Sequence, residues 1–544
     1  MHPQKSRNKL YLIGMVILAA CSSTTVDQKP SSNTDPIAVP TDPVLVPATP
    51  DAQVLRSEQN TSIYAVTCYT PGALKLGPAW SLNDTSLSLA ADGTLVLKSL
   101  GQPSLTPYGF DLSVISADTA KAPLTVYVRC LPQNFPKVKI EGRFTDWLML
   151  TTGANPLAEE KVGSFRIIME PNGFPAHITQ GPWMVADFFR EGDRIISFQD
   201  ITLPPGAPVV QSFSNTPGMG FQSAELYGPP DTKWVPTKGA GLDPHAATIL
   251  PNGNLLGLIY EEVVDTPIQS KSVVPSSSTT QSCEPAPAKN NDPVLRGRIV
   301  EVTSSGEVVH NWRIEDHLPQ ALRAPLWISI YSLIGKEPYC AIDAEHLNAI
   351  TFYQEKGAPK GEGTAIVTGR HIDGAIMVKW PQGEVLWSLG GNSTDKSLQI
   401  IGDPLEGLSL PHDAHFLSKD EVMVFDNRTF GKSSRVVVYR IDLATRSATL
   451  IETYTVNCPT SISSKNLCGA FAMGSARLTL DGKKVLIGMG TSNVTAAEIP
   501  RVKQGMVQEA TATLVLEGSW SYRVLPAEPF DSMELYRSQI PAKP

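Results

Sequence analysis

The sequence predicts an all-β protein, a six-bladed β-propeller preceded by a small N-terminal β-sandwich. One observation is that apolar runs are short and bounded by turns rich in Gly and Pro, as in Pro171-Asn172-Gly173. Four such runs read as strands, at 167–169, 194–198, 422–425 and 436–439. Helical periodicity is nearly absent outside residues 319–334.

The second observation is a layout that repeats along the chain. His346, His412 and Ser475 stand at equivalent points, separated by 66 (412 − 346) and 63 (475 − 412) residues. His245 stands at the same point of an earlier unit, 101 residues (346 − 245) before His346. This interval is longer than the other two, and we attribute the extra length to a Ser/Pro/Thr-rich stretch at 266–293 and to the apolar 319–334 segment.

Each unit has a strand, a turn, a second strand and a Gly-Glu-Val element followed by an aromatic residue. Repeats of about four strands are typical of a β-propeller. Two earlier units, starting near Asp146 and Ala186, bring the expected total to six blades. We expect the β-sandwich over 53–137 and the propeller over 138–540.

The N-terminus predicts export. Three cations precede an apolar run at 10–20 that ends in Leu-Ala-Ala-Cys, the pattern of a secretory signal peptide over 1–20. The ending resembles a bacterial lipobox, so Cys21 is the expected lipidation site; ordinary cleavage after Ala20 is the alternative. Ser22 and Ser23 favour an outer-membrane anchor facing the periplasm. Residues 21–52, rich in Ser, Thr and Pro, are expected to form a disordered tether.

Charge and cysteine content narrow the function classes. Removing the signal changes the formal charge from −8 to −11 (42 basic against 53 acidic residues), and no basic stripe points to nucleic acid. An even cysteine count in an exported chain favours disulfides, and the lack of a CxxC pair argues against structural zinc. Fifteen pairings are possible; we favour the first two and the last two cysteines as pairs, with the third by elimination. The six candidates are Cys68, Cys130, Cys283, Cys340, Cys458 and Cys468.

The three repeat histidines are the main indication of function. Residues at equivalent points of a circular repeat converge on one axis, and three converging imidazoles are hard to explain as core filling. We expect His371 and His415 to be packing or rim residues. Ordinary blade positions are expected for His177, His310 and His317. Aromatic residues at a strand position between blades are expected in the core; these are Trp312 and Trp387.

Several motifs, in their order along the chain, resemble one family, the bacterial arylsulfate sulfotransferases. These enzymes do not use PAPS and are built on a six-bladed propeller. The resemblance covers most of the mature chain, and the 266–293 and 319–334 segments depart from the family pattern. The motifs are Tyr127 to Pro132, Glu345 to Ile350, Thr368 to His371, Val385 to Gly391, Pro411 to Ala414, Val424 to Asn427, and Ser434-Arg435.

The resemblance implies sulfuryl transfer from an aryl sulfate to a phenolic acceptor, with no cofactor. His412 would be the nucleophile, because neutral imidazole can carry the group. His245, His346, Asn348 and Arg370 would hold the sulfuryl oxygens or move protons. His346 and Asn348 are two residues apart, so on a strand they share a face.

Two alternatives stay open at this point. A propeller fold does not imply activity, so a non-catalytic lipoprotein that binds a ligand or an envelope partner is the second interpretation. A histidine cluster can also bind metal, but no carboxylate or cysteine accompanies these histidines at a regular spacing, so we expect no metal. The 319–334 segment is hypothesised to cover the channel mouth.

Overall fold

The structure is a computed structural model of the chain, and it describes the propeller in separate stretches. The described residues are 45–47, 62–66, 74–76, 80–83, 88–96, 109–116, 123–132, 134–155, 162–180, 187–198, 218–263, 294–318, 326–330, 339–429, 433–456, 469–502, 509–531 and 534–535. Strands dominate these residues, and the one helix among them, α1 (Ile314–His317), is a single turn.

The N-terminal part contributes eight strands to the description. β2, β8, β7 and β4 form one four-stranded sheet, with β2 parallel to β8; β1 pairs with β3, and β5 pairs with β6. The bounds are β1 (Leu45–Pro47), β2 (Ser62–Val66), β3 (Leu74–Leu76), β4 (Trp80–Leu82), β5 (Ser88–Leu89), β6 (Leu95–Val96), β7 (Gly109–Ser116) and β8 (Leu124–Cys130).

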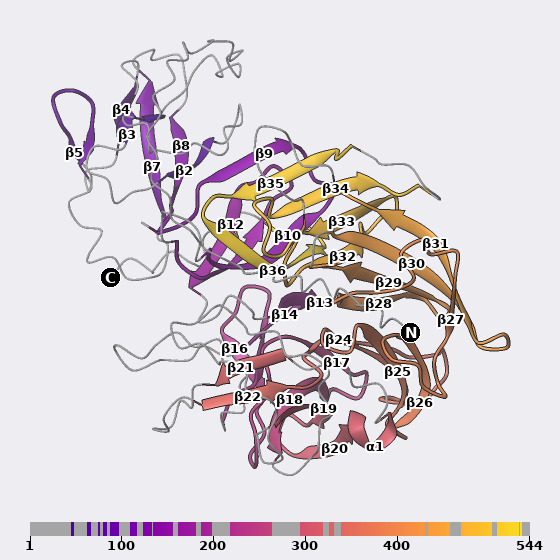
Figure 1. The fold of residues 1–544 in the computed structure, drawn as a ribbon. Coiled ribbons are helices and arrows are strands. Elements are labelled where there is room, and N and C mark those ends of the chain that lie inside the picture. The colour runs from indigo at the N-terminus through magenta and orange to yellow at the C-terminus, as the bar shows by residue number, and fades with distance from the viewer. Residues whose placement is uncertain are drawn as a thin grey trace, which may run out of the picture. The chain divides into compact units, whose positions relative to one another are not determined.

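Six further sheets form the blades of a β-propeller (Figure 1), as the sequence predicts. Blades II to V each use consecutive strands. Blade II is β13 (Phe188–Glu191), β14 (Arg194–Phe198), β15 (Phe221–Glu225) and β16 (Pro230–Trp234). Blade III is β17 (Ala247–Ile249), β18 (Leu255–Val263), β19 (Val294–Val302) and β20 (Val308–Arg313).

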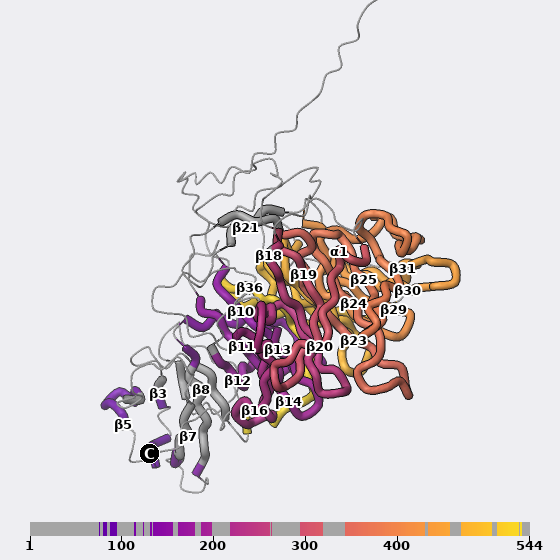
Figure 2. Tube along the Cα trace, turned by 90° about the horizontal axis from the view of Figure 1, so that it is seen from below, coloured from indigo at the N-terminus to yellow at the C-terminus, as the bar shows by residue number. Residues whose placement is uncertain are grey.

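Blades IV and V continue the same order. Blade IV is β23 (Leu347–Tyr353), β24 (Gly363–Gly369), β25 (Gly374–Trp380) and β26 (Glu384–Gly390). Blade V is β28 (His412–Ser418), β29 (Glu421–Asp426), β30 (Arg435–Asp442) and β31 (Ser447–Tyr454), extended by β27 (Gln399–Ile401). The strands can be followed along the trace in Figure 2.

The ring is closed twice, because two blades combine strands from both ends of the propeller. Blade I places β36 (Ser519–Ala527) beside β10 (Trp147–Ala154), followed by β11 (Phe165–Met169) and β12 (Pro175–Gln180). Blade VI joins β32 (Ser475–Leu478), β33 (Lys484–Gly488), β34 (Ala496–Pro500) and β35 (Ala512–Leu516) to β9 (Val138–Gly142). Each closure ties an early strand to a late one.

The core lies between neighbouring blades, and strand periodicity explains why. Side chains alternate between the two faces of a strand. On β29, Val422 and Val424 pack toward blade IV, whereas Met423 and Phe425 pack toward blade VI. Burying each such side chain contributes roughly 1.5–3 kcal/mol, so a blade with two apolar faces holds both neighbours.

Several expectations can be compared with these elements. The four predicted strand runs lie in β11, β14, β29 and β30, and Trp312 and Trp387 are buried between blades, as predicted. The helical structure predicted from the periodicity of 319–334 is wrong for residues 326–330. These residues form strand β21 (Leu326–Ile330), which pairs with β22 (Tyr339–Asp343), and β22 lies beside β19. The apolar residues at 326–330 fit either the helical or the strand period, and the pairing with β22 favours the strand.

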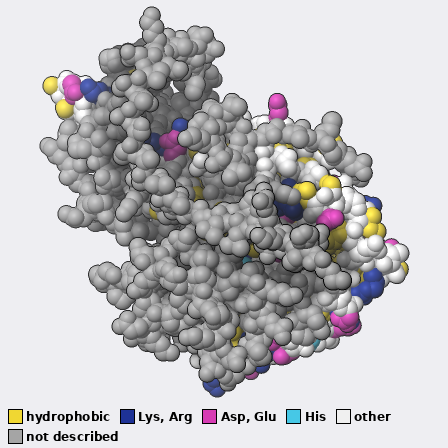
Figure 3. All heavy atoms as spheres, viewed as in Figure 1, with side chains coloured by type: hydrophobic (Ala, Val, Ile, Leu, Met, Phe, Trp, Pro, Cys, Tyr) yellow, Lys and Arg dark blue, Asp and Glu magenta, His cyan; other side chains and the backbone are white. Residues whose placement is uncertain are grey.

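Some expectations fall outside the described residues. The signal peptide, Cys21 and most of the tether are outside them, as is the 266–293 stretch, which separates β18 from β19. Backbone is described for Cys130 and Cys340, but no side chain of the six paired-cysteine candidates is described, so the disulfides stay a prediction. Within the described residues, no helix has the length and apolar character needed to cross a membrane. On the described surface that faces the viewer in Figure 3, acidic and basic side chains are interspersed.

Candidate active site

The four equivalent points of the repeat all lie where a blade's first strand begins. His346 directly precedes β23, His412 and Ser475 open β28 and β32, and His245 comes two residues before β17. The rings of His245 and His346 have centroids 5.4 Å apart. His412 lies close enough for both, together with Arg370, to affect its pKa. The predicted site residues are therefore brought together.

The turn that presents His346 is held from the neighbouring blade. Glu345 is fully buried; it accepts from Arg296 Nη1 at 2.7 Å and from the Gly297 N–H at 3.0 Å, both on β19. Burial raises the pKa of Glu345 to about 7, opposed by Arg296. His346 itself has φ of 48°. Such left-handed conformations in non-glycine residues cost energy and often occur at functional sites.

Two of the histidines are backed by buried carboxylates. His245 Nδ1 lies 2.6 Å from Asp243 Oδ1, and His346 Nδ1 lies 2.5 Å from Asp343 Oδ2. Both aspartates are fully buried. A carboxylate at Nδ1 orients an imidazole and stabilises its protonated form. Burial, His245 and Arg370 nevertheless lower the pKa of His346 well below 6.5, so this ring is neutral at rest.

His412 is held differently, by an amide and not by a carboxylate. Its Nδ1 lies 2.7 Å from Asn427 Oδ1, at the end of β29, and its Nε2 accepts from the Met473 N–H at 3.2 Å. Burial, then Arg370 and His346, lower its pKa well below 6.5. His412 is therefore a neutral imidazole with an unprotonated Nε2, which is the state that a nucleophile needs.

Arg370 supplies the positive charge of the cluster. Its Nη1 donates to His371 Nε2 at 3.0 Å, and its Nη2 to the Phe471 carbonyl at 3.4 Å. Nε is buried with no hydrogen-bond partner among the described residues. Burial lowers the pKa of Arg370 to about 10, opposed by Asp343 and Asp373. A buried guanidinium with spare donor capacity is suited to bind an oxyanion.

Asn348 faces the same cluster from β23. Its Nδ2 donates to the Pro411 carbonyl at 2.9 Å, directly before His412, while its buried Oδ1 has no partner among the described residues. Its backbone carbonyl accepts two bonds of 2.7 Å, from Tyr522 Oη and Arg523 Nη2. The side chain thus offers an acceptor for a substrate hydroxyl.

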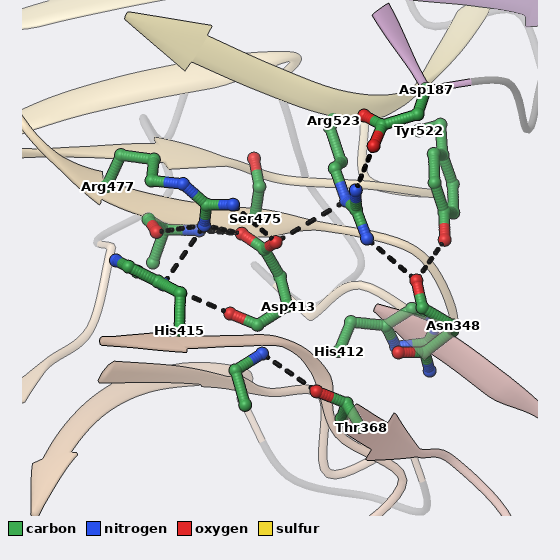
Figure 4. A network of polar contacts seen from close by, with 12 residues as sticks. Asp187, Asn348, Thr368, His412, Asp413, His415, Ser475, Arg477, Tyr522 and Arg523 are labelled. Carbon is green, nitrogen blue, oxygen red and sulfur yellow. Dashed lines mark hydrogen bonds and ion pairs between the residues drawn. The ribbon is translucent and has the colours of Figure 1, made fainter. Parts of the chain in front are cut away.

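A charge network lies on the other side of Asn348 (Figure 4). Arg523, on the closing strand β36, contacts Asp187 of blade II at 2.8 Å and Asp413 of blade V at 3.4 Å. Asp413 also pairs with Arg477 of blade VI. With the bond to the Asn348 carbonyl in blade IV, Arg523 links its own blade to three others.

A metal ion could in principle use one group of side chains here. Donor atoms of Asp343, His346 and His371 lie within 4.8 Å of one another. However, both His371 nitrogens are engaged, since Nδ1 donates to the Asp343 carbonyl at 2.8 Å and Nε2 accepts from Arg370. The adjacent guanidinium also repels a cation. The group fits a hydrogen-bonded set better than a metal site.

Sequence reasoning missed several residues of this cluster. It found no carboxylate at a regular spacing from the histidines, and it gave no role to Asp243 and Asp343, which precede their partners by two and three residues. It placed His371 with packing or rim residues, but the ring is buried, with its centroid 4.6 Å from that of His346. Asn427 lies in the Val424 to Asn427 motif, but no role was predicted for it. The short Asp–His spacings were a usable signal; the partnership of Asn427 with His412 follows only from the pairing of β28 with β29.

Fold and cluster together define a β-propeller protein with a buried, histidine-rich polar site at the start of its blades. Residues 276–523 match the sequence model of the arylsulfotransferase (ASST) family. This match confirms the resemblance drawn from the motifs: residues 276–523 are similar to the arylsulfotransferase family, which indicates a sulfotransferase. The matched range includes four of the five predicted catalytic residues and leaves out His245.

Comparison with curated proteins found no match. Among solved structures, similar chains include a periplasmic gluconolactonase from Pseudomonas aeruginosa, 10% identical with a TM-score of 0.35, covering 72% of this chain and 100% of its own. A protein of unknown function from Bacteroides caccae is 11% identical with a TM-score of 0.33, covering 71% and 100%. At these scores neither likeness supports an argument about function.

Proposed function

We propose that the protein transfers a sulfuryl group from an aryl sulfate to a phenolic acceptor through a covalent intermediate on His412. The observation that carries the proposal is that a neutral His412, with an unprotonated Nε2, lies among two further imidazoles and a buried arginine. The family match supports the substrate classes, and the site supports the chemistry.

The first half-reaction forms one bond and breaks another. The Nε2 lone pair of His412 exchanges its hydrogen bond from the Met473 N–H for a bond to sulfur, the bond between sulfur and the aryl oxygen breaks, and its electron pair leaves with that oxygen. An imidazolium at His346 or His245 gives a proton to the leaving phenolate. The negative charge of a bound sulfate favours the protonated form of His346, and both carboxylate-backed rings are oriented to exchange a proton with the phenolic oxygen.

The second half-reaction reverses the roles. The acceptor phenol loses its proton to the same imidazole, its oxygen attacks sulfur, and the N–S bond breaks with its pair returning to Nε2. Arg370 would bind the sulfuryl oxygens, with Nε available because it has no hydrogen-bond partner among the described residues. Asn348 Oδ1 would accept the phenolic hydrogen before transfer.

An exposed aromatic ring supports binding of aryl groups at this site. Phe471 is 59% exposed, and its ring centroid lies 5.7 Å from the Arg370 guanidinium carbon. An aryl ring can stack on such a face. We assign Phe471 to contact the aromatic part of donor or acceptor while Arg370 binds the charged part.

Rapid quenching with an aryl sulfate alone tests the proposal. Donor without acceptor should add one sulfuryl group to the peptide that contains His412, and steady-state kinetics should be ping-pong. His412→Ala and His412→Asn should both abolish labelling and turnover while the far-ultraviolet circular dichroism stays unchanged. Full activity of His412→Ala, or a label found only elsewhere, would overturn it. A non-catalytic binding propeller would show neither label nor turnover in the wild type.

A further inference from the structure

We propose that Asn427 is a positioning residue that selects the attacking nitrogen of His412, by locking the ring in the form with hydrogen on Nδ1 and a lone pair on Nε2. The inference deepens the proposed function and rests on it. Its basis is a closed ring of three hydrogen bonds that joins His412, Asn427 and the peptide groups of Met473.

The direction of these bonds is set by the backbone. The Met473 N–H can only donate, so His412 Nε2 must accept and carry no hydrogen. The Met473 carbonyl can only accept, as can that of Ala470, so the atoms of Asn427 at 2.8 and 3.1 Å from them must be its Nδ2. Asn427 Oδ1 then faces His412 Nδ1 at 2.7 Å, which requires hydrogen on Nδ1. Backbone polarity thus fixes both the amide orientation and the tautomer, which side-chain contacts alone leave ambiguous.

Asn427 is itself held rigidly. Asn427 is fully buried, and its backbone carbonyl accepts a hydrogen bond from Ser434 Oγ at 2.8 Å. On the Nε2 side of the His412 imidazole, Met473 has φ of 63° and Gly474 has φ of 111°. A Cβ at Gly474 would come within 2.4 Å of the Phe425 ring, so glycine lets the backbone reach His412 here. Both partners of the imidazole are therefore fixed before substrate arrives.

An amide, unlike a carboxylate, adds no negative charge beside the nucleophile. Asp243 and Asp343 back the other two imidazoles, where a carboxylate orients each ring for proton transfer. Other charged or titratable groups face His412 from its neighbours; they are Arg370, His346 and His245, with Asp413 and His415 on its own strand and Arg477 on β32. Asp413 is paired with Arg477 and Arg523, so its charge is largely compensated.

The test compares Asn427→Ala and Asn427→Asp with the wild type, using 4-nitrophenyl sulfate as the donor. Nitrogen NMR of protein with ¹⁵N-labelled histidine should show His412 of the wild type as the Nδ1–H form, assigned by its loss in His412→Asn. In Asn427→Ala the Met473 N–H still favours an unprotonated Nε2 but the acceptor at Nδ1 is lost, so the Nε2–H form should be populated beside the Nδ1–H form. Its single-turnover rate should fall about 10–10²-fold, as for residues that orient a reacting group, with KM for the donor within about twofold.

Asn427→Asp separates tautomer control from simple packing, because it keeps an oxygen opposite Nδ1 while it loses the Nδ2 donor to the Met473 and Ala470 carbonyls. At pH 9 it should react at least about tenfold faster than Asn427→Ala. Asn311→Asp, which adds the same charge at an exposed position of β20, should behave as the wild type. Chemical denaturation of each variant shows whether it is folded under the assay conditions.

Two results would overturn the assignment: an Nε2–H form of His412 in the wild type, or an Asn427→Ala rate within about twofold of the wild type. Both leave the proposed function standing if donor still labels His412. Conversely, if wild-type protein carries no label on His412, the proposed mechanism has failed, whatever the tautomer.

Discussion

Two polar regions meet at Asn348, and they differ in how completely their charges are paired. In the Arg523 network, two arginines face two aspartates across several blades, although Asp187 Oδ1 and Arg523 Nε also lack a hydrogen bond among the described residues. In the imidazole cluster, Arg370 keeps an unpartnered Nε and Asn348 an unpartnered Oδ1 within the described residues. Opposite charges in contact are what a buried structural network requires, whereas an arginine without a carboxylate partner among the described residues suits an anionic substrate. The comparison separates residues that join the blades of the propeller from residues proposed to take part in sulfuryl transfer.

The largest expected effect on stability lies in the network. Arg523→Met removes the partner of Asp187 and leaves a buried carboxylate without its ion pair, which costs on the order of 3–5 kcal/mol of unfolding free energy. Chemical denaturation measures the loss. Arg313→Met, on the exposed outer strand of blade III, is the matched control and should change stability by less than about 0.5 kcal/mol. An unchanged midpoint for Arg523→Met would contradict the structural role.

Arg370→Met should show the opposite pattern. Losing the oxyanion donors should slow transfer about 10²–10³-fold. Because burial already disfavours the charge of Arg370, the unfolding free energy should fall by no more than about 1 kcal/mol. Rate and denaturation measured on one preparation check both parts. A large loss of stability with normal transfer would place Arg370 with the network.

Acid should weaken both regions through their buried histidines. Burial lowers the pKa of His371 and of His415 to about 3, against about 6.5 when unfolded. The unfolded chain therefore binds more protons between pH 6.5 and 3, so stability is complete above 6.5 and is lost as pH falls. At pH 5 each histidine costs about 2 kcal/mol.

Denaturation at pH 7 and pH 5 measures this loss of stability. His415→Gln should remove about 1.4 kcal/mol per pH unit from the dependence below 6.5. His310→Gln, at an exposed position of β20, should leave it unchanged. An equal slope in His415→Gln and the wild type would show that His415 is protonated in the folded state.

Phe471→Ala should have the smallest effect. Losing one stacking face costs roughly 0.5–1.5 kcal/mol, which raises KM for an aryl sulfate about two- to tenfold with little change in kcat. Initial-rate kinetics provide the measurement. Phe471→Tyr retains the ring and should match the wild type. If KM stays the same in Phe471→Ala, the ring does not contact substrate.

The sequence predicted the fold better than the site. Alternation and turns are local signals, so the blade starts at His346, His412 and Ser475 could be read directly. The imidazole partners depend on which strands pair: Asn427 reaches His412 because β28 and β29 are antiparallel neighbours. Arg523 lies 175 residues from Asn348 yet bonds to its carbonyl, a contact that no local pattern encodes. Position within a repeat shows which residues converge, whereas hydrogen-bond direction needs coordinates.

The double closure of the ring also orders events in time. β36 is the last strand of the propeller to be synthesised, and it pairs with β10, where Trp147 faces Ala527. Until it docks, the carbonyl of Asn348 lacks the donors that Tyr522 and Arg523 provide. Such distant pairing is slow, because a long loop must close before its contacts form. A nascent or truncated chain would therefore hold its histidines without a competent site, and catalytic turnover would report that the ring has closed.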